Sequence, residues 1–324
     1  MGESARSVRK ETSFMFKKPI ILGLLAAMAL IMQALGCASA QRRADGSAAS
    51  AMMDEAKTLY DQQRFGSAAR LFKKLSDRSI YDDTYAEEAT FYLGECSCLR
   101  ADYVDAYHVY ERLLGEYPRT RYYEKAVERE FVIGADFCTG RKAAFWKRGG
   151  WGAKVLLAAL AHRPFGEYSA EARMILADYY LEAGDYDEAL HHYDLLTNEY
   201  AGSKEAKQAP YRRALCLYHN VQGNRYNSDE TGKAIEGLET AEKSVAAQPK
   251  SNTNQDRLGD IQSKLKELHE IEAREYYDLG RFFLKNGNRN GAAAYFSAVV
   301  KEAPGSSYAA LAQKALDGIV QEQN

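Results

Sequence analysis

The sequence predicts an all-α protein, a tetratricopeptide-like α-solenoid of five to six helical hairpins closed by a carboxy-terminal capping helix. Three observations predict this fold. From residue 51 onward, apolar residues recur with the helical period of about 3.6, and almost nothing alternates as a strand would. Small and bulky side chains return at set intervals along the chain, and prolines separate the units. With 46% hydrophobic and 27% charged residues among 324, the chain has ample material for a packed core.

The clearest unit spans 272–305. Its pattern consists of Tyr276, Leu279, Gly280, Phe283, Ala292, Phe296 and Pro304. This spacing matches the tetratricopeptide pattern, in which two antiparallel helices approach closely at the small residues while the aromatic residues fill the space beside them. Such a hairpin cannot bury its apolar face alone, so neighbouring units are expected.

Less regular units precede this one. We expect hairpins at about 51–85, 86–124, 125–169, 170–206 and 207–252, then the unit at 272–305 and a cap at 306–320. An insertion at 139–152 interrupts the third unit, and the fifth unit is degenerate. The last helix covers the end of the stack, as the terminal unit of a repeat array must.

The first 36 residues are typical of a signal peptide. Basic residues precede an apolar run from Pro19 to Met32, which is too short for a comfortable membrane span of about 20 residues. The run ends at Gly36-Cys37, in a pattern that resembles the lipobox of bacterial lipoproteins. That resemblance implies acyl chains on Cys37, and Ala38 after it implies an outer-membrane anchor that faces the periplasm. Residues 37–50 would then form a flexible tether. An ordinary signal peptide or short anchor with an incidental cysteine is the alternative.

A second regularity lies at the junctions between units. Pro118, Pro164 and Pro304 are each followed after four residues by Tyr122, Tyr168 and Tyr308, and after four more by alanine. Proline fixes the turn, and the tyrosine packs back at the start of the next helix. Over about residues 51–318 these junctions, with 163–169 the closest match, resemble those of outer-membrane assembly lipoproteins of the BamD (YfiO) type. The resemblance implies a component of the machinery that inserts β-barrel proteins into the outer membrane.

Patterns that carry catalysis are missing from the sequence, so we expect no enzyme, no cofactor, no metal and no small-molecule substrate. The histidines are scattered, and none forms the i, i+4 pair with an intervening glutamate of a zinc hydrolase. We therefore expect them on solvated helix faces. A glycine-rich phosphate loop and a strand for a nucleophile elbow are also missing. The net charge of −2 argues against a general nucleic-acid binder.

Four cysteines follow Cys37, namely Cys96, Cys98, Cys138 and Cys216. An exported protein meets an oxidising compartment, so disulfide pairing has to be considered. Cys96 and Cys98 point to different sides of one helix. Cys98 and Cys138 share a repeat position in adjacent units, whose helix axes lie about 8–10 Å apart, usually too far for a disulfide. We expect buried free thiols, with one bridge as the alternative.

The insertion at 139–152 combines tryptophans with basic residues. We single out Arg141, Lys142, Trp146, Lys147, Arg148 and Trp151 as a candidate docking loop. Tryptophan and arginine are common binding hot spots, and a long loop in a compact repeat array is more often functional than accidental. A contact with lipid headgroups is one alternative. The other is that the tryptophans fold back over the stack while the charges stay in water.

The hollow side of the solenoid is the second candidate site. By analogy with tetratricopeptide arrays, the residues expected to face a partner-binding groove are Phe91, Glu95, Met174, Asp178, Arg274, Tyr277 and Arg281. This groove would run from acidic to basic and would orient an extended peptide or helix of a partner. The alternative is a merely solvated curved face.

Together these observations predict a non-enzymatic, lipid-anchored periplasmic scaffold. Its expected partners are proteins of the outer-membrane assembly machinery or extended substrate peptides, and its contact with the membrane would be through acyl chains on Cys37. Another cell-envelope scaffold, in division, peptidoglycan synthesis or pilus assembly, is the alternative, because such proteins use the same repeats.

Overall fold

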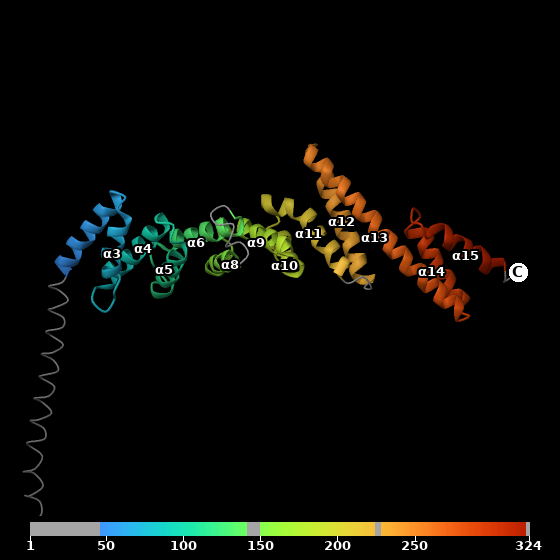
Figure 1. The fold of residues 1–324 in the computed structure, drawn as a ribbon, viewed down its shortest axis with the longest axis horizontal. Helices are drawn as coiled ribbons and strands as arrows, with labels where there is room; N and C mark the ends of the chain where they lie inside the picture. The colour runs from blue at the N-terminus through green and yellow to red at the C-terminus, as the bar shows by residue number, and fades with distance from the viewer. Residues whose placement is uncertain (1–45, 141–149, 224–227, 322–324) are drawn as a thin grey trace, which may run out of the picture. The chain divides into compact units, whose positions relative to one another are not determined.

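The computed structural model describes residues 46–140, 150–223 and 228–321. The regular secondary structure of this part of the chain is helical and includes no strand, which confirms the all-α class. The chain divides into two compact units, Met1–Val127 and Glu128–Asn324. Figure 1 shows their helices, coloured by residue number.

In the first unit, a helix over 46–61 precedes α3 (Phe65–Leu75), α4 (Asp83–Leu99), α5 (Tyr103–Glu116) and the start of α6 (Tyr123–Cys138). The first helix starts inside the segment 37–50 that the sequence assigned to a tether. It starts there because Ala49 and Met53 are already buried in one cluster with Phe72 of α3.

The second unit contains the rest of α6, followed by α8 (Trp151–His162), α9 (Ser169–Ala183), α10 (Tyr186–Glu199), α11 (Lys204–Gly223), α12 (Ser228–Ala246), α13 (Asn252–Lys285), α14 (Arg289–Glu302) and α15 (Ala309–Gln321). From α8 to α15, each helix packs against the next one along the chain (Figure 1). These antiparallel hairpins confirm the predicted tetratricopeptide-like solenoid, with α15 as its capping helix.

The turns inside the hairpins share one backbone conformation. A residue with positive φ follows the first helix in four of the described hairpins, at Gln63, Ala101, Gly184 and Gly287. The next residue donates its backbone N–H to a carbonyl five residues earlier, as Asn288 does to Phe283 at 2.9 Å. This bond is typical of helix ends with a left-handed residue. The bond closes the turn, so that the second helix runs antiparallel to the first.

Close approach within the hairpins explains the small residues of the pattern. A Cβ atom added to Gly94 would lie 2.6 Å from the ring of Tyr110, and one added to Gly280 would lie 2.6 Å from the ring of Phe296. Both rings are fully buried. Glycine therefore allows one helix to rest on the aromatic side chain of the other, as the sequence predicted.

The tyrosines that follow the junction prolines pack on the preceding helical hairpin. Tyr122 stacks on Phe91 with ring centroids 4.2 Å apart, and Tyr168 stacks on Phe131 at 4.8 Å. Tyr308 lies against Tyr277 at 5.6 Å. The three aromatic partners occupy the same repeat position, three residues before the glycine. These contacts hold consecutive hairpins together within each unit.

Residues 253–271 received no element from the sequence, and the structure shows them to be the first part of the long helix α13. Ile261 and Leu268 are fully buried there, in one cluster with Ala214 of α11 and Leu238 of α12. The unit at 207–252 therefore has a third helix layered on its hairpin. Helix α13 then continues as the first helix of the next hairpin, which it forms with α14.

Two tyrosines of α11 fasten this first part of α13. The Tyr211 hydroxyl donates to Asp260 at 2.9 Å, and the Tyr218 hydroxyl donates to Glu267 at 2.5 Å. Burial, reinforced by these carboxylates, raises the pKa of both tyrosines to about 12, so both hydroxyls stay protonated donors at neutral pH. The pairs are seven residues apart on each helix, which aligns α11 with α13.

The prediction of free thiols after Cys37 is confirmed. Cys96, Cys138 and Cys216 are buried thiols, and Cys98 is a half-buried thiol. Burial raises the pKa of Cys96 and of Cys216 to about 12. Thiolate is the reactive form, so these two cysteines are inert packing residues.

Candidate partner-binding surface

Three of the seven predicted groove residues lie in the core instead. Phe91 and Glu95 of α4 and Met174 of α9 are at most 7% exposed. Phe91 is covered by the stacked ring of Tyr122. The junction tyrosine therefore occupies the space in which a partner would have to lie. The prediction of an accessible groove position is wrong for these three residues.

Two acidic residues from the predicted groove instead bind tyrosine hydroxyls inside their own hairpins. Tyr110 donates to Glu95 at 2.6 Å, and Tyr193 donates to Asp178 at 2.6 Å, both across 15 residues of sequence. Asp178 also pairs with Arg212 of α11 at 2.9 Å. Burial raises the pKa of Asp178, although the Tyr193 hydroxyl and Arg212 oppose the rise. These carboxylates join helices and are not free to recognise a partner.

Replacing Tyr110 by phenylalanine should therefore destabilise the first unit by about 2 kcal/mol, the typical value of a hydrogen bond to a charged group. The reason is that Glu95 loses the Tyr110 hydroxyl while it stays buried. Tyr193→Phe should cost less, because Asp178 is only half-buried and keeps the Arg212 guanidinium. Urea unfolding followed by circular dichroism measures both changes. Equal losses in the two variants would contradict this account.

The other groove residues, Arg274, Tyr277 and Arg281, lie on the second half of α13. Both arginines are exposed, and Tyr277 is half-buried. Asp278 lies between the arginines, with its carboxylate 3.8 Å from Arg274 Nε and 4.0 Å from Arg281 Nη1. Exposed ion pairs at such distances are weak. Both guanidinium groups can therefore exchange Asp278 for an external anion.

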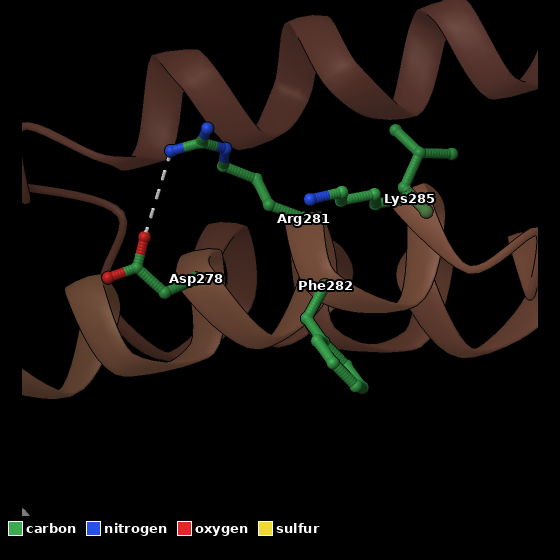
Figure 2. Close-up of a pocket in the computed structure, with 5 residues that line it drawn as sticks. Asp278, Arg281, Phe282 and Lys285 are labelled. Atoms are coloured by element: carbon green, nitrogen blue, oxygen red, sulfur yellow. Dashed lines mark ion pairs between the residues drawn. The ribbon is translucent and has the colours of Figure 1, made fainter.

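Arg281 also lines a surface pocket of about 570 Å³ together with Asp278, Phe282, Leu284 and Lys285. Figure 2 shows the side chains of Arg281 and Lys285 on one side of the helix and Phe282 directed away from them. Phe282 is 60% exposed, which is unusual for a large aromatic residue. The pocket thus combines two cations with accessible apolar surface.

Arg274 lines a second pocket of about 450 Å³, earlier on α13. Its other lining residues are Ser263, Lys266, Glu267, Glu270, Ile271 and Tyr308. Glu270 accepts a hydrogen bond from the backbone N–H of Ser307 at 2.9 Å and another from its hydroxyl. This contact ties α13 to the turn before α15. The surface of α13 from residue 263 to 285, with both pockets, is the candidate partner-binding surface.

Most of the predicted docking loop, Arg141, Lys142, Trp146, Lys147 and Arg148, lies outside the described residues. Trp151 is described, at the first position of α8. It is half-buried, and its ring meets Phe137 of α6 edge-on at 4.7 Å. For Trp151 the structure therefore favours the alternative in which the tryptophan folds back on the stack.

The predicted signal peptide and Cys37 also lie outside the described residues. Within 46–140, 150–223 and 228–321, no helix is both long and apolar enough to span a membrane.

Comparison with known families connects this arrangement of hairpins to a class of proteins. Residues 150–322, more than half of the chain, match the family YfiO, described as an outer membrane lipoprotein. The chain belongs to the YfiO family. Residues 53–119 match a tetratricopeptide-repeat family in addition. The predicted resemblance to BamD (YfiO) type proteins is thereby confirmed.

A curated relative of this YfiO-family chain is the outer membrane protein assembly factor BamD of Caulobacter vibrioides, 25% identical over 186 residues. The match covers 57% of the chain and only 56% of that relative. Among solved structures, a tetratricopeptide repeat protein from Parabacteroides merdae has 11% identity and a TM-score of 0.35, over 85% of this chain and 100% of that one. The human IFIT1 dimer has 15% identity and a TM-score of 0.28, over 83% and 72%. Such low TM-scores carry no inference about function.

Proposed function

We propose that this YfiO-family protein is a non-enzymatic, lipid-anchored scaffold that faces the periplasm and serves in the assembly of outer-membrane β-barrel proteins. The observation that carries the proposal is the YfiO match over residues 150–322, supported by a relative named for outer-membrane protein assembly. A helical solenoid is suited to this role because it presents extended surface to protein partners.

In this proposal the two ends of the chain have separate tasks. Acyl chains on Cys37 fix the amino terminus to the membrane, since two or three chains anchor stably where one is marginal. Arg274 and Arg281 of α13, held only by weak pairs with Asp278, offer the charges that orient a partner. The basic, aromatic insertion around Trp146 is proposed as a second protein contact.

Cys37→Ala should abolish acylation, because the thiol of this cysteine is the proposed site of lipid attachment. In cells fed with labelled palmitate, the wild-type chain should carry label, and the variant should carry none. Cys98→Ala, which removes a half-buried thiol elsewhere, should keep the label. A labelled Cys37→Ala chain would refute the lipoprotein assignment.

Crosslinking in cells followed by mass spectrometry tests the role itself. The expected partner is an outer-membrane β-barrel protein with soluble periplasmic domains. Depletion of the scaffold should also lower the amount of folded barrels in the outer membrane. Recovery of division or cell-wall proteins alone, with barrel levels unchanged, would assign the chain to a different envelope scaffold.

A further inference from the structure

Helix α13 contains a seven-residue apolar pattern in addition to the tetratricopeptide one. Spacings of three and four residues alternate along a single stripe, here called the seam, which consists of Leu258, Ile261, Leu265, Leu268, Glu272, Glu275, Leu279 and Phe282. This is the spacing by which one helix packs along another in a coiled coil. All of it lies within one continuous helix, Asn252–Lys285.

The first half of the seam is packed on neighbouring helices. Ile261 and Leu268 are fully buried, and Leu258 and Leu265 pack beside them, in a cluster with residues of α11 and α12 such as Leu238. The seam therefore already works as a helix-packing surface within this protein.

The helix α11, which packs on the first half of the seam, ends before the second half begins. Gln222, next to the last residue of α11, donates to Glu267 at 2.9 Å, so the end of α11 lies level with that residue. Leu279 is twelve residues further along α13, about 18 Å at the helical rise. There Leu279 is 40% exposed and Phe282 is 60% exposed. The seam continues as an uncovered face.

Two glutamates separate the covered half from the uncovered one. Glu272 and Glu275 are half-buried and hold the seam positions between Leu268 and Leu279. Burial, followed by the charge of Glu272, raises the pKa of Glu275. Polar residues at such positions fix the register of helix packing. These two glutamates therefore determine the position along α13 at which an additional helix can begin to pack on the seam.

One flank of the uncovered half is positively charged. Arg281 and Lys285 line the same pocket as Phe282 (Figure 2). Arg274 is exposed two turns before Arg281, beside Asp278. At the uncovered half itself, Arg281 and Lys285 accompany the single carboxylate of Asp278. Because complementary charge sets register and partner choice, the stripe favours acidic residues on an incoming segment.

We infer that the uncovered seam at Leu279 and Phe282 binds an amphipathic helix of a partner protein, with apolar residues at the seam spacing and acidic residues facing Arg274, Arg281 and Lys285. The occupant continues the packing that α11 and α12 provide over the first half of α13. This inference deepens the proposed function and rests on its premise that the chain binds proteins.

A designed helical peptide of about three heptads tests the inference, with leucine at the seam spacing and glutamate on the flanks. Its binding to the mature chain without the lipidated cysteine, residues 38–324, is measured by fluorescence anisotropy. The double variant Leu279→Ser/Phe282→Ser should weaken binding by at least about tenfold, since two apolar side chains lose their burial. Arg281→Glu/Lys285→Glu should weaken it to a similar extent and should favour a peptide with lysine flanks.

Matched controls keep the outcomes separable. Leu311→Ser, at a residue of α15 that is 48% exposed and off the seam, should bind like the wild type.

The inference is overturned if the wild type binds the lysine-flanked peptide as tightly as the glutamate-flanked one, or if the seam variant binds as the wild type does. If the wild-type chain without peptide forms a dimer and the seam variant does not, the face binds a second copy of the chain. Seam-dependent binding to anionic phospholipid vesicles without peptide binding would assign it to the membrane. The crosslinking in cells reports on partners of the whole chain, whereas the peptide assay reports on this face alone, so either test can fail without the other.

Discussion

Gly134→Ala is expected to destabilise the second unit by about 3 kcal/mol, at the upper end of the usual cost of overpacking. An added Cβ would lie 2.9 Å from the backbone nitrogen of Leu156 and 3.0 Å from the carbonyl oxygen of Gly152. Both atoms belong to the backbone of α8, so no rotamer change can relieve the contact. The two helices would have to separate, which loosens the buried residues around Leu156.

Urea unfolding monitored by tryptophan fluorescence measures this effect. Trp146 and Trp151 are the only tryptophans of the sequence. The ring of Trp151 packs on Phe137 of α6, so its fluorescence reports on the contact between α6 and α8. Gly318→Ala in α15 is the matched control. An added Cβ there meets no atom within 4 Å, so the variant should be neutral or more stable by up to about 1 kcal/mol. Similar midpoints for the two variants would show that α6 and α8 do not cross as closely as described.

The repeat pattern was readable from the sequence because each of its residues serves a local contact. Gly280 and Phe296 touch within one hairpin, and Tyr122 touches the residue three positions before Gly94. Such contacts recur at constant separations along the chain. The fold class and the hairpin junctions could therefore be predicted without knowledge of how distant parts of the chain meet.

The accessible site was harder to predict because neighbouring positions on one helix differ in burial. Phe91 and Tyr277 occupy equivalent repeat positions, yet Phe91 is buried and Tyr277 is half-buried, since each depends on its own junction tyrosine. In the sequence, Glu95 looks like a solvent-exposed glutamate. The signal that could have identified it as buried is Tyr110, 15 residues later, because the same separation joins Asp178 to Tyr193.

The seam of α13 is hard to recognise in the sequence for a different reason. Within a repeat of about 34 residues, a seven-residue pattern looks like irregular spacing. Only the burial of Leu268 beside the exposure of Leu279 separates the packed half of the helix from the half that remains uncovered. A pattern locates the stripe, but the ends of the neighbouring helices determine its accessibility.

His192 shows how burial changes the chemistry of a residue expected on a solvated face. It is 2% exposed, and its ring stacks on Tyr180 with centroids 5.6 Å apart. Arg173 Nη1 lies 3.3 Å from its Nδ1. A guanidinium can only donate, so Nδ1 accepts and the neutral ring carries its proton on Nε2. Burial, followed by the charges of Arg173 and His191, lowers the pKa of His192 to about 4.

Stability should consequently fall on acidification. Between the ordinary pKa of histidine, about 6.5, and the folded value, the unfolded chain binds a proton that the folded chain does not bind. Stability from this group is complete above about pH 6.5 and is lost as the pH falls toward 4. At about 1.4 kcal/mol for each pKa unit, the full loss amounts to about 3 kcal/mol.

His192→Gln should remove this component, because glutamine offers Arg173 an acceptor and does not titrate. Urea unfolding at several pH values between 7 and 4 should show the wild type losing about 3 kcal/mol more than the variant. Part of the acid sensitivity should persist in both proteins, since burial, together with Lys264, also lowers the pKa of His219. His191→Gln, at the exposed neighbouring position, should follow the wild type. Parallel curves for wild type and His192→Gln would mean that the folded and unfolded chains bind the proton of His192 equally, and that burial does not lower its pKa.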